Sequence, residues 1–297
     1  MKAVLAPLPV LGILLGCAGA LHAQEPVVVE PARPSFLKTP RLFSEEKPES
    51  EGEERKDEIE TDRDSFTPST TTAGKRRLIF ESGWTFLDNR GYKETNSLPE
   101  ALFRFGLTER LELRLATNYE VGGVGSDVSG GTGGEEFDSL GKLERESTIS
   151  YGFKYRLTEV DNWLPGSAFI VQAATPTSGN TTNTQLATTY VFGWELPYQM
   201  KLDSSFRYIL ATEEHDHFNE WAPSVVLKVP VGERINIHAE YFGVFSTNKA
   251  EAINHQYFSP GAHYLITENF EVGFRLGWGL NDQTPRFFSN IGVGLRF

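Results

Sequence analysis

The stretch FFSNIGVGLRF, residues 287–297, alternates strictly between two faces and stops on an aromatic residue. One face carries Phe287, Ser289, Ile291, Val293, Leu295 and Phe297. Backbone N–H and C=O groups are costly when they lack partners away from water, so a chain that ends in a strand must pair that strand. We therefore expect the final strand to close against the first strand of a transmembrane β-barrel.

The same alternation recurs upstream at even spacing and predicts twelve strands in all. They are expected at 77–87, 101–107, 111–119, 149–157, 169–173, 186–194, 202–210, 221–229, 235–245, 258–266, 270–280 and 287–297. This pattern predicts an all-β fold, an antiparallel meander transmembrane β-barrel of about twelve strands over residues 76–297. An even number of strands puts both ends on the periplasmic side, with short turns there and longer outer loops such as 211–217.

Aromatic residues recur near the ends of these strands on the apolar face, as in the interfacial girdles of membrane barrels. They are Trp84, Tyr119, Trp194, Tyr208, Trp221, Trp278 and Phe297. A soluble β-sandwich also alternates, but its apolar face is internal, and runs of this length with so many outward aromatics are unusual there.

The first 23 residues have the form of a signal peptide. Lys2 precedes a mostly apolar run at 4–15, and Ala23 offers a cleavage site before Gln24. A rival interpretation is a lipoprotein box at 14–17, which would leave Cys17, the sole cysteine of the chain, acylated. No later run of eighteen apolar residues exists, which excludes a helical membrane protein.

Residues 24–75 differ in composition, and we expect them to form a disordered acidic periplasmic segment. Residues 45–64 carry eleven acidic and four basic side chains, with Ile59 as their one aliphatic residue. Such a segment buries too little apolar surface to offset its ordering entropy. It would serve as a solvated linker or tether, or as a plug that enters the barrel. The net charge of the chain, −12, argues against a nucleic-acid partner.

Two stretches, TDRDSFT at 61–67 and LPEALFRFGLTERLELR at 98–114, resemble the outer-membrane family named for the putative meta-pathway of phenol degradation. Asp64 stands where that family usually has proline. The resemblance implies an outer-membrane barrel of a transporter type that passes small aromatic or apolar compounds. It supplies no catalytic residues.

With the apolar face outward, parity places the polar positions inside the barrel. The candidates for lining the lumen or its constriction are Glu100, Arg104, Glu112, Arg114, Lys154, Arg156, Asp203, Arg207, Lys228, Glu240, His263, Glu271 and Arg275. Inward acids and bases nearly balance, which predicts weak charge selectivity and a constriction crossed by salt bridges. The alternative is that these charges only brace a narrow barrel. Glu100, Arg104, Glu112 and Arg114 are expected to cluster at the first periplasmic hairpin.

Catalytic and metal chemistry finds little support. Ser259 and His263 share a face, but four strand residues separate them by about 13 Å, too far for a hydrogen bond. His215 and His217 on an outer loop could bind Zn²⁺ or Cu²⁺, but a charged, hydrated loop is the favoured interpretation. Loop 122–141 lacks the helix and Lys-Ser/Thr pair of a phosphate site, while its acids leave Ca²⁺ bridging open. We expect no catalytic residues, metal or cofactor.

These observations favour a channel of the bacterial outer membrane for passive passage of small solutes. A barrel enzyme acting on lipid and a closed-lumen structural or adhesion anchor are the alternatives. The expected partners are outer-membrane lipid, the barrel-assembly machinery through Phe297, and a small-molecule solute.

Overall fold

The structure is a computed structural model. It describes residues 58–63, 65–123, 128, 145–178, 183–213, 216–249 and 252–297. The signal-peptide and lipoprotein interpretations of residues 1–23, including Cys17, lie outside this part of the chain, as does most of the glycine-rich loop.

Twelve antiparallel strands and one short 3-10 helix make up the described secondary structure. The strands are β1 (Leu78–Asp88), β2 (Thr95–Gly106), β3 (Leu111–Val121), β4 (Glu146–Thr158), β5 (Gly166–Ser178), β6 (Gln185–Glu195), β7 (Lys201–Glu213), β8 (Asp216–Val231), β9 (Ile235–Thr247), β10 (Asn254–Thr267), β11 (Phe270–Gly279) and β12 (Phe287–Arg296). The helix, η1 (Pro197–Gln199), lies between β6 and β7. In the described residues no helix has the length and apolar character needed to cross a membrane.

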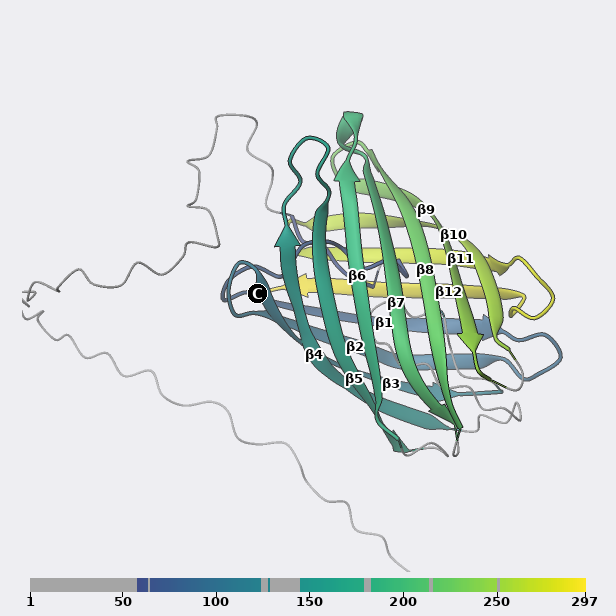
Figure 1. Cartoon of the computed structure of the whole chain (residues 1–297). Coiled ribbons are helices and arrows are strands. Elements are labelled where there is room, and N and C mark those ends of the chain that lie inside the picture. The colour runs from purple at the N-terminus through teal and green to yellow at the C-terminus, as the bar shows by residue number, and fades with distance from the viewer. Residues whose placement is uncertain are drawn as a thin grey trace, which may run out of the picture. The chain divides into compact units, whose positions relative to one another are not determined.

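Each strand pairs with its neighbours in the sequence, and β12 pairs with β1 to close the barrel (Figure 1). In this closing pair Phe80 lies opposite Leu295 and Trp84 lies opposite Ile291. The all-β closed antiparallel barrel predicted from alternation is confirmed, including its final strand.

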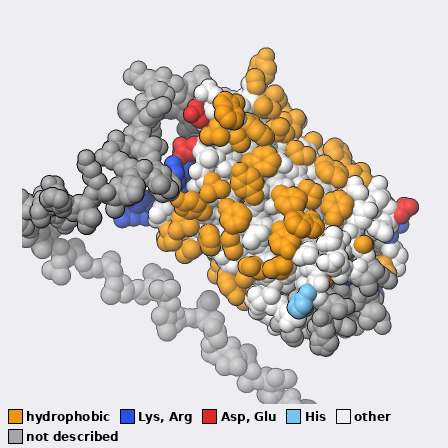
Figure 2. Space-filling model, viewed as in Figure 1, with side chains coloured by type: hydrophobic (Ala, Val, Ile, Leu, Met, Phe, Trp, Pro, Cys, Tyr) orange, Lys and Arg blue, Asp and Glu red, His pale blue; other side chains and the backbone are white. Residues whose placement is uncertain are grey.

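Burial alternates along the strands as the sequence predicts. In β3 the side chains of Leu113 and Leu115 are 45% and 51% exposed, whereas Arg114 between them is 3% exposed. Every strand exposes large apolar side chains, and the face of the barrel seen in Figure 2 is densely apolar. A soluble monomer rarely exposes so continuous an apolar surface, whereas a bilayer would cover it.

Short connections gather at the barrel end where β12 finishes. The β10–β11 turn lies beside the last strand, because Asn269 O accepts the Arg296 N–H at 2.9 Å. The expected loop at 211–217 is wrong in extent: β7 runs to Glu213 and β8 begins at Asp216. Strand pairing continues further there because backbone hydrogen bonds do not require apolar side chains.

The N-terminal segment differs from the expected disordered one over its described part. Residues 58–63 and 65–75 lead directly into β1, and Ile59, Asp62, Phe66 and Ser69 are all buried. This matches the alternative interpretation of a plug that enters the barrel. The expectation of disorder for 24–57 lies outside the described residues. We call residues 58–75 the plug.

Candidate functional site

The plug enters and leaves the lumen at the end of the barrel where the short turns lie. At its start, the Ile59 N–H donates to Glu268 O in the β10–β11 turn at 2.9 Å. Near its end, Thr72 Oγ1 donates to Glu109 O in the β2–β3 turn at 2.7 Å. Between these points it reaches Glu240 in the middle of β9. The plug is therefore a loop that passes into the bore and returns.

Asp62 is the plug's main ionic anchor. Its carboxylate accepts hydrogen bonds from Arg114 Nη1 at 2.6 Å and from Lys154 Nζ at 3.1 Å. Its Oδ1 also accepts the Ser69 N–H at 3.0 Å, which ties the two arms of the plug together. Burial alone would raise the pKa of Asp62, but the neighbouring cations, Arg104 first among them, hold that pKa well below its usual range.

The barrel wall around Asp62 carries its own ion pairs. Arg104 donates to Glu112 at 2.9 Å and to Glu81 at 3.0 Å, and Arg114 donates to Glu112 at 2.7 Å. Glu81 in turn accepts the backbone N–H groups of Asp62 and Arg63 at 3.0 Å each. With Lys154 included, three acids and three bases with fully buried side chains make a neutral cluster. Such a cluster tolerates burial because each charge is paired.

Further contacts hold the plug on other sides of the bore. Arg63 forms an ion pair with Glu100 of β2, and Thr61 Oγ1 donates to Glu271 of β11. Glu60 pairs with Lys201 of β7 at 3.1 Å. Burial raises the pKa of Glu60, but the attraction of Lys201 and other cations outweighs it and lowers that pKa to about 2. The plug is therefore fixed to strands on several sides of the barrel.

The tip of the plug is held by a carboxylate and by aromatic stacking. Glu240 accepts the Phe66 N–H at 2.9 Å, and the Thr67 N–H and hydroxyl at 2.7 Å each. The Phe66 ring stacks on Phe242 with centroids 4.3 Å apart and planes 5° apart. The Arg207 guanidinium lies over the same ring, 4.6 Å from its centroid.

An apolar cluster surrounds this tip inside the barrel. Its members are Phe66, Leu87, Val128, Ala187, Ile209, Ala211, Phe218, Ala222, Phe242, Val244, Ile253, Tyr257 and Phe288. Sequence reasoning missed it because inward positions were expected to be polar. A signal was present: Tyr241-Phe242, Tyr257-Phe258 and Phe287-Phe288 are adjacent aromatic pairs, and alternation turns one member of each pair inward.

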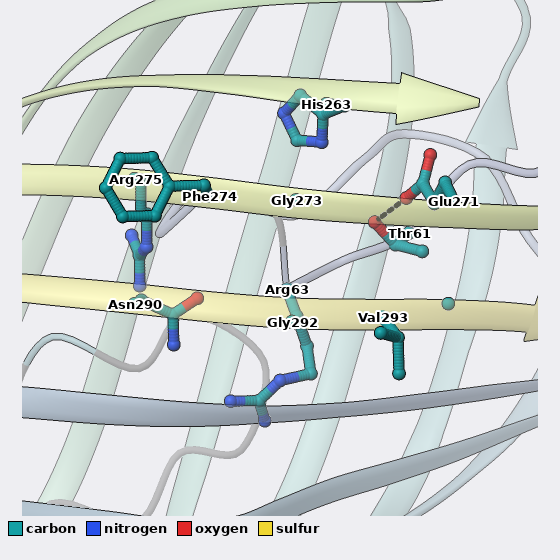
Figure 3. Close-up of a pocket in the computed structure, with 11 residues that line it drawn as sticks. Thr61, Arg63, His263, Glu271, Gly273, Phe274, Arg275, Asn290, Gly292 and Val293 are labelled. Atoms are coloured by element: carbon teal, nitrogen blue, oxygen red, sulfur yellow. Dashed lines mark hydrogen bonds between the residues drawn. The ribbon is translucent and has the colours of Figure 1, made fainter. Parts of the chain in front are cut away.

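A small cavity lies beside the plug, against β10, β11 and β12 (Figure 3). Its volume of about 20 Å³ admits roughly one water molecule. Thr61 and Arg63 of the plug line it together with His263, Glu271 and Arg275 of the barrel. An aromatic solute does not fit this cavity while the plug is in place.

All but one of the thirteen side chains predicted to line the lumen are buried. The exception, Arg156, is half-buried and pairs with Glu159 at 3.1 Å. Arg104, Glu112 and Arg114 meet as expected, whereas Glu100 pairs with Arg63 of the plug instead. The role of all thirteen in solute passage stays a prediction.

The histidines and serine considered for chemistry have other neighbours. His263 Nε2 lies 2.9 Å from Nδ1 of His238, a residue that sequence reasoning did not single out. Ser259 Oγ donates to Leu276 O at 2.8 Å. His215 lies outside the described residues, and so do the loop acids Asp127, Glu135, Glu136 and Asp138. Within the described ranges, no group of three or more His, Cys, Asp or Glu is placed to hold a metal ion.

Two solved structures resemble this fold. The crystal structure of the COG4313 outer membrane channel from Pseudomonas putida F1 is 14% identical, with a TM-score of 0.56; the match covers 77% of this chain and 98% of that one. The NanC porin structure is 8% identical, with a TM-score of 0.49, over 73% of this chain and 98% of that one. No curated protein matches the chain. The family model described as the putative MetA-pathway of phenol degradation matches residues 61–297, so the resemblance expected from the sequence is confirmed and the chain belongs to this family.

Proposed function

We propose that this chain is a channel of a bacterial outer membrane for small solutes, and that the plug closes it. The observation that carries the proposal is that the bore is occupied by a segment that belongs to no strand, residues 58–75, held by hydrogen bonds and ion pairs. A barrel that is only a scaffold can fill its bore with strand side chains, as small barrels do. A segment that precedes the first strand can leave and return without breaking any strand pairing.

The solute class follows from the lining beyond the ionic cluster. Phe242, Tyr257 and Phe288 face the bore, with the Phe242 and Tyr257 rings 4.7 Å apart. Ligand sites are typically lined by apolar and aromatic side chains with a few polar groups. We infer small aromatic or apolar compounds as the solutes.

The outer-membrane location is supported by the apolar outer surface and the closed barrel fold (Figure 2). Outer-membrane lipid would then be the solvent of the exposed side chains. We infer that the side chain of Phe297, which is 71% exposed, is contacted by the barrel-assembly machinery. That contact is part of the proposal.

Conductance in planar bilayers tests the channel. We compare the wild type with a double variant, Asp62→Asn and Arg63→Ala, which removes two anchors of the plug, and with Glu159→Gln, an exposed ion-pair control. Wild type should show rare discrete steps, and the double variant should show frequent ones. If neither opens, the channel proposal fails.

A closed-lumen anchor is the second candidate, favoured by the small size of the cavity beside the plug. An anchor needs no conducting state. Neither wild type nor the double variant would then conduct ions in the bilayer, although the plug of the double variant would exchange its amide hydrogens faster.

A further inference from the structure

The contacts around Phe66 belong to the barrel rather than to the plug. The stacking partner Phe242 and the carboxylate of Glu240 lie on β9, and the guanidinium of Arg207 lies on β7. Arg275 of β11 adds a cation 3.5 Å from the Glu240 carboxylate. When the tip of the plug withdraws, these groups stay behind on rigid strands.

The vacated place has a defined chemistry. It offers a ring face at Phe242 for stacking and a guanidinium at Arg207 for a cation–π contact. It also leaves Glu240 without the three hydrogen bonds that Phe66 and Thr67 supply. A buried carboxylate that loses its donors is costly, so a replacement must bring a donor as well as a ring.

The replacement should carry no net charge. An arene with a carboxylate has no N–H or O–H to donate, so it would leave Glu240 without a donor and set a second negative charge against it. An arene with an ammonium group would meet Arg207 and Arg275, both buried near the same place. Like charges in a buried site are strongly unfavourable. An O–H or an uncharged N–H group satisfies Glu240 without this penalty.

We propose that Phe66 occupies, as an internal ligand, a binding site of the barrel for an uncharged arene that bears a hydrogen-bond donor. This inference rests on the proposed channel function and names its solute class. In Phe66 the donating nitrogen is three bonds from the ring, along the side chain. The solute would compete with Phe66 for the ring site and for Glu240, and so favour withdrawal of the plug.

Three probes of similar size separate the contributions of the ring, the hydrogen-bond donor and the charge to binding. In 2-phenylethanol the hydroxyl is three bonds from the ring, as the nitrogen is in Phe66. Propylbenzene replaces the hydroxyl with a methyl group, and phenylacetate carries a negative charge. Binding is measured by calorimetry on the full chain in lipid nanodiscs, with protein-free discs subtracted for partition into lipid.

Phe66→Ala removes the ring but keeps the backbone N–H donors of residues 66 and 67 and the Thr67 hydroxyl, so the alcohol reaches Glu240 only when the tip withdraws. Withdrawal is easier once the stacking on Phe242 and the cation–π contact with Arg207 are gone. The variant should therefore bind 2-phenylethanol about tenfold more tightly than wild type, and about tenfold more tightly than it binds propylbenzene or phenylacetate. Phe66→Leu keeps apolar volume without a ring, and its affinity for 2-phenylethanol should lie between those of wild type and Phe66→Ala. This variant preserves the test if the alanine variant folds poorly. Adding Glu240→Gln to Phe66→Ala should reduce the preference for the alcohol.

Leu87→Ala is the matched control. Leu87 is buried in the same apolar cluster, but its removal leaves the Phe66 ring stacked on Phe242, so the tip of the plug keeps the contact that Phe66→Ala removes. The Leu87→Ala variant should bind 2-phenylethanol and propylbenzene with equal affinity. The inference is overturned if Phe66→Ala binds no tighter than wild type, shows no preference for the alcohol, or shows the same preference as Leu87→Ala.

Conductance of the same Phe66→Ala samples separates this inference from the proposed function. Discrete steps without selective binding overturn the internal-ligand site and leave the channel standing. Selective binding without any steps overturns the channel and leaves a closed barrel with a binding site.

Discussion

Asp62 Oδ2 lies 2.6 Å from Arg114 Nη1, although fifty-two residues separate the two in the sequence. This ion pair joins the plug to β3 inside the barrel, and both side chains are fully buried. It makes the position of the plug depend on charges of the barrel wall rather than on the plug's own sequence propensities.

Asp62→Asn should loosen the plug without unfolding the barrel. It removes one charge of a neutral buried cluster and leaves Arg114 and Lys154 short of their counter-ion, a change that costs about 3 kcal/mol. Amide exchange at Phe66 and Thr67 should then accelerate about a hundredfold. Hydrogen exchange followed by mass spectrometry of plug peptides measures this. The exposed pair of Arg156 provides the control: Glu159→Gln should leave exchange unchanged.

Acid should release the plug, and only well below neutral pH. The pKa of Glu60 falls from 4.5 to about 2, and that of Asp62 is also depressed. A depressed pKa in the folded state stabilises the closed form above the ordinary pKa and ceases to do so as pH falls through the folded value. The part of the opening frequency that depends on Glu60 and Asp62 should therefore be constant from about pH 8 to pH 5 and rise as these two carboxylates become protonated below about pH 4. Comparison of wild type with Asp62→Asn isolates that part. A rise between pH 8 and pH 6 would point to other groups.

Gly294 of β12 leaves room for the plug. A side-chain carbon at this position would overlap Cγ2 of Thr61, so Gly294→Ala should displace the start of the plug and raise opening frequency. Gly273→Ala on neighbouring β11 is the matched control, because its new carbon would meet only ordinary contact with His263 Nδ1 at 3.4 Å. Equal gating in the two variants would argue against a plug held at Thr61.

The strands could be predicted because their signal is local. Side chains of a strand alternate between the outer face and the bore, so each strand carries an alternation of apolar and polar residues. Leu113, Arg114 and Leu115 show this alternation. The same alternation predicts that Arg104 and Glu112, which form a buried ion pair, point into the barrel.

The sequence did not predict that the plug is ordered, because the contacts that stabilise the plug are not local. Composition describes what a segment can bury by itself, and residues 58–75 contain few apolar side chains. Their partners are Arg114, Lys154 and Glu240, which folding of the barrel brings together from three different strands. The inward aromatic Phe242 was likewise hidden beside the outward Tyr241.

A charge on the outer face should test the alternation directly. Phe274 in the middle of β11 is 48% exposed, whereas its neighbour Arg275 is 1% exposed. If hydrocarbon surrounds this face, Phe274→Arg should lower the free energy of unfolding in liposomes by about 2–4 kcal/mol, since arginine is most costly near the bilayer midplane. Phe274→Leu keeps the site apolar and should cost far less. Urea titrations followed by tryptophan fluorescence give both values, and equal stability of the two variants would mean that water, not lipid, covers Phe274.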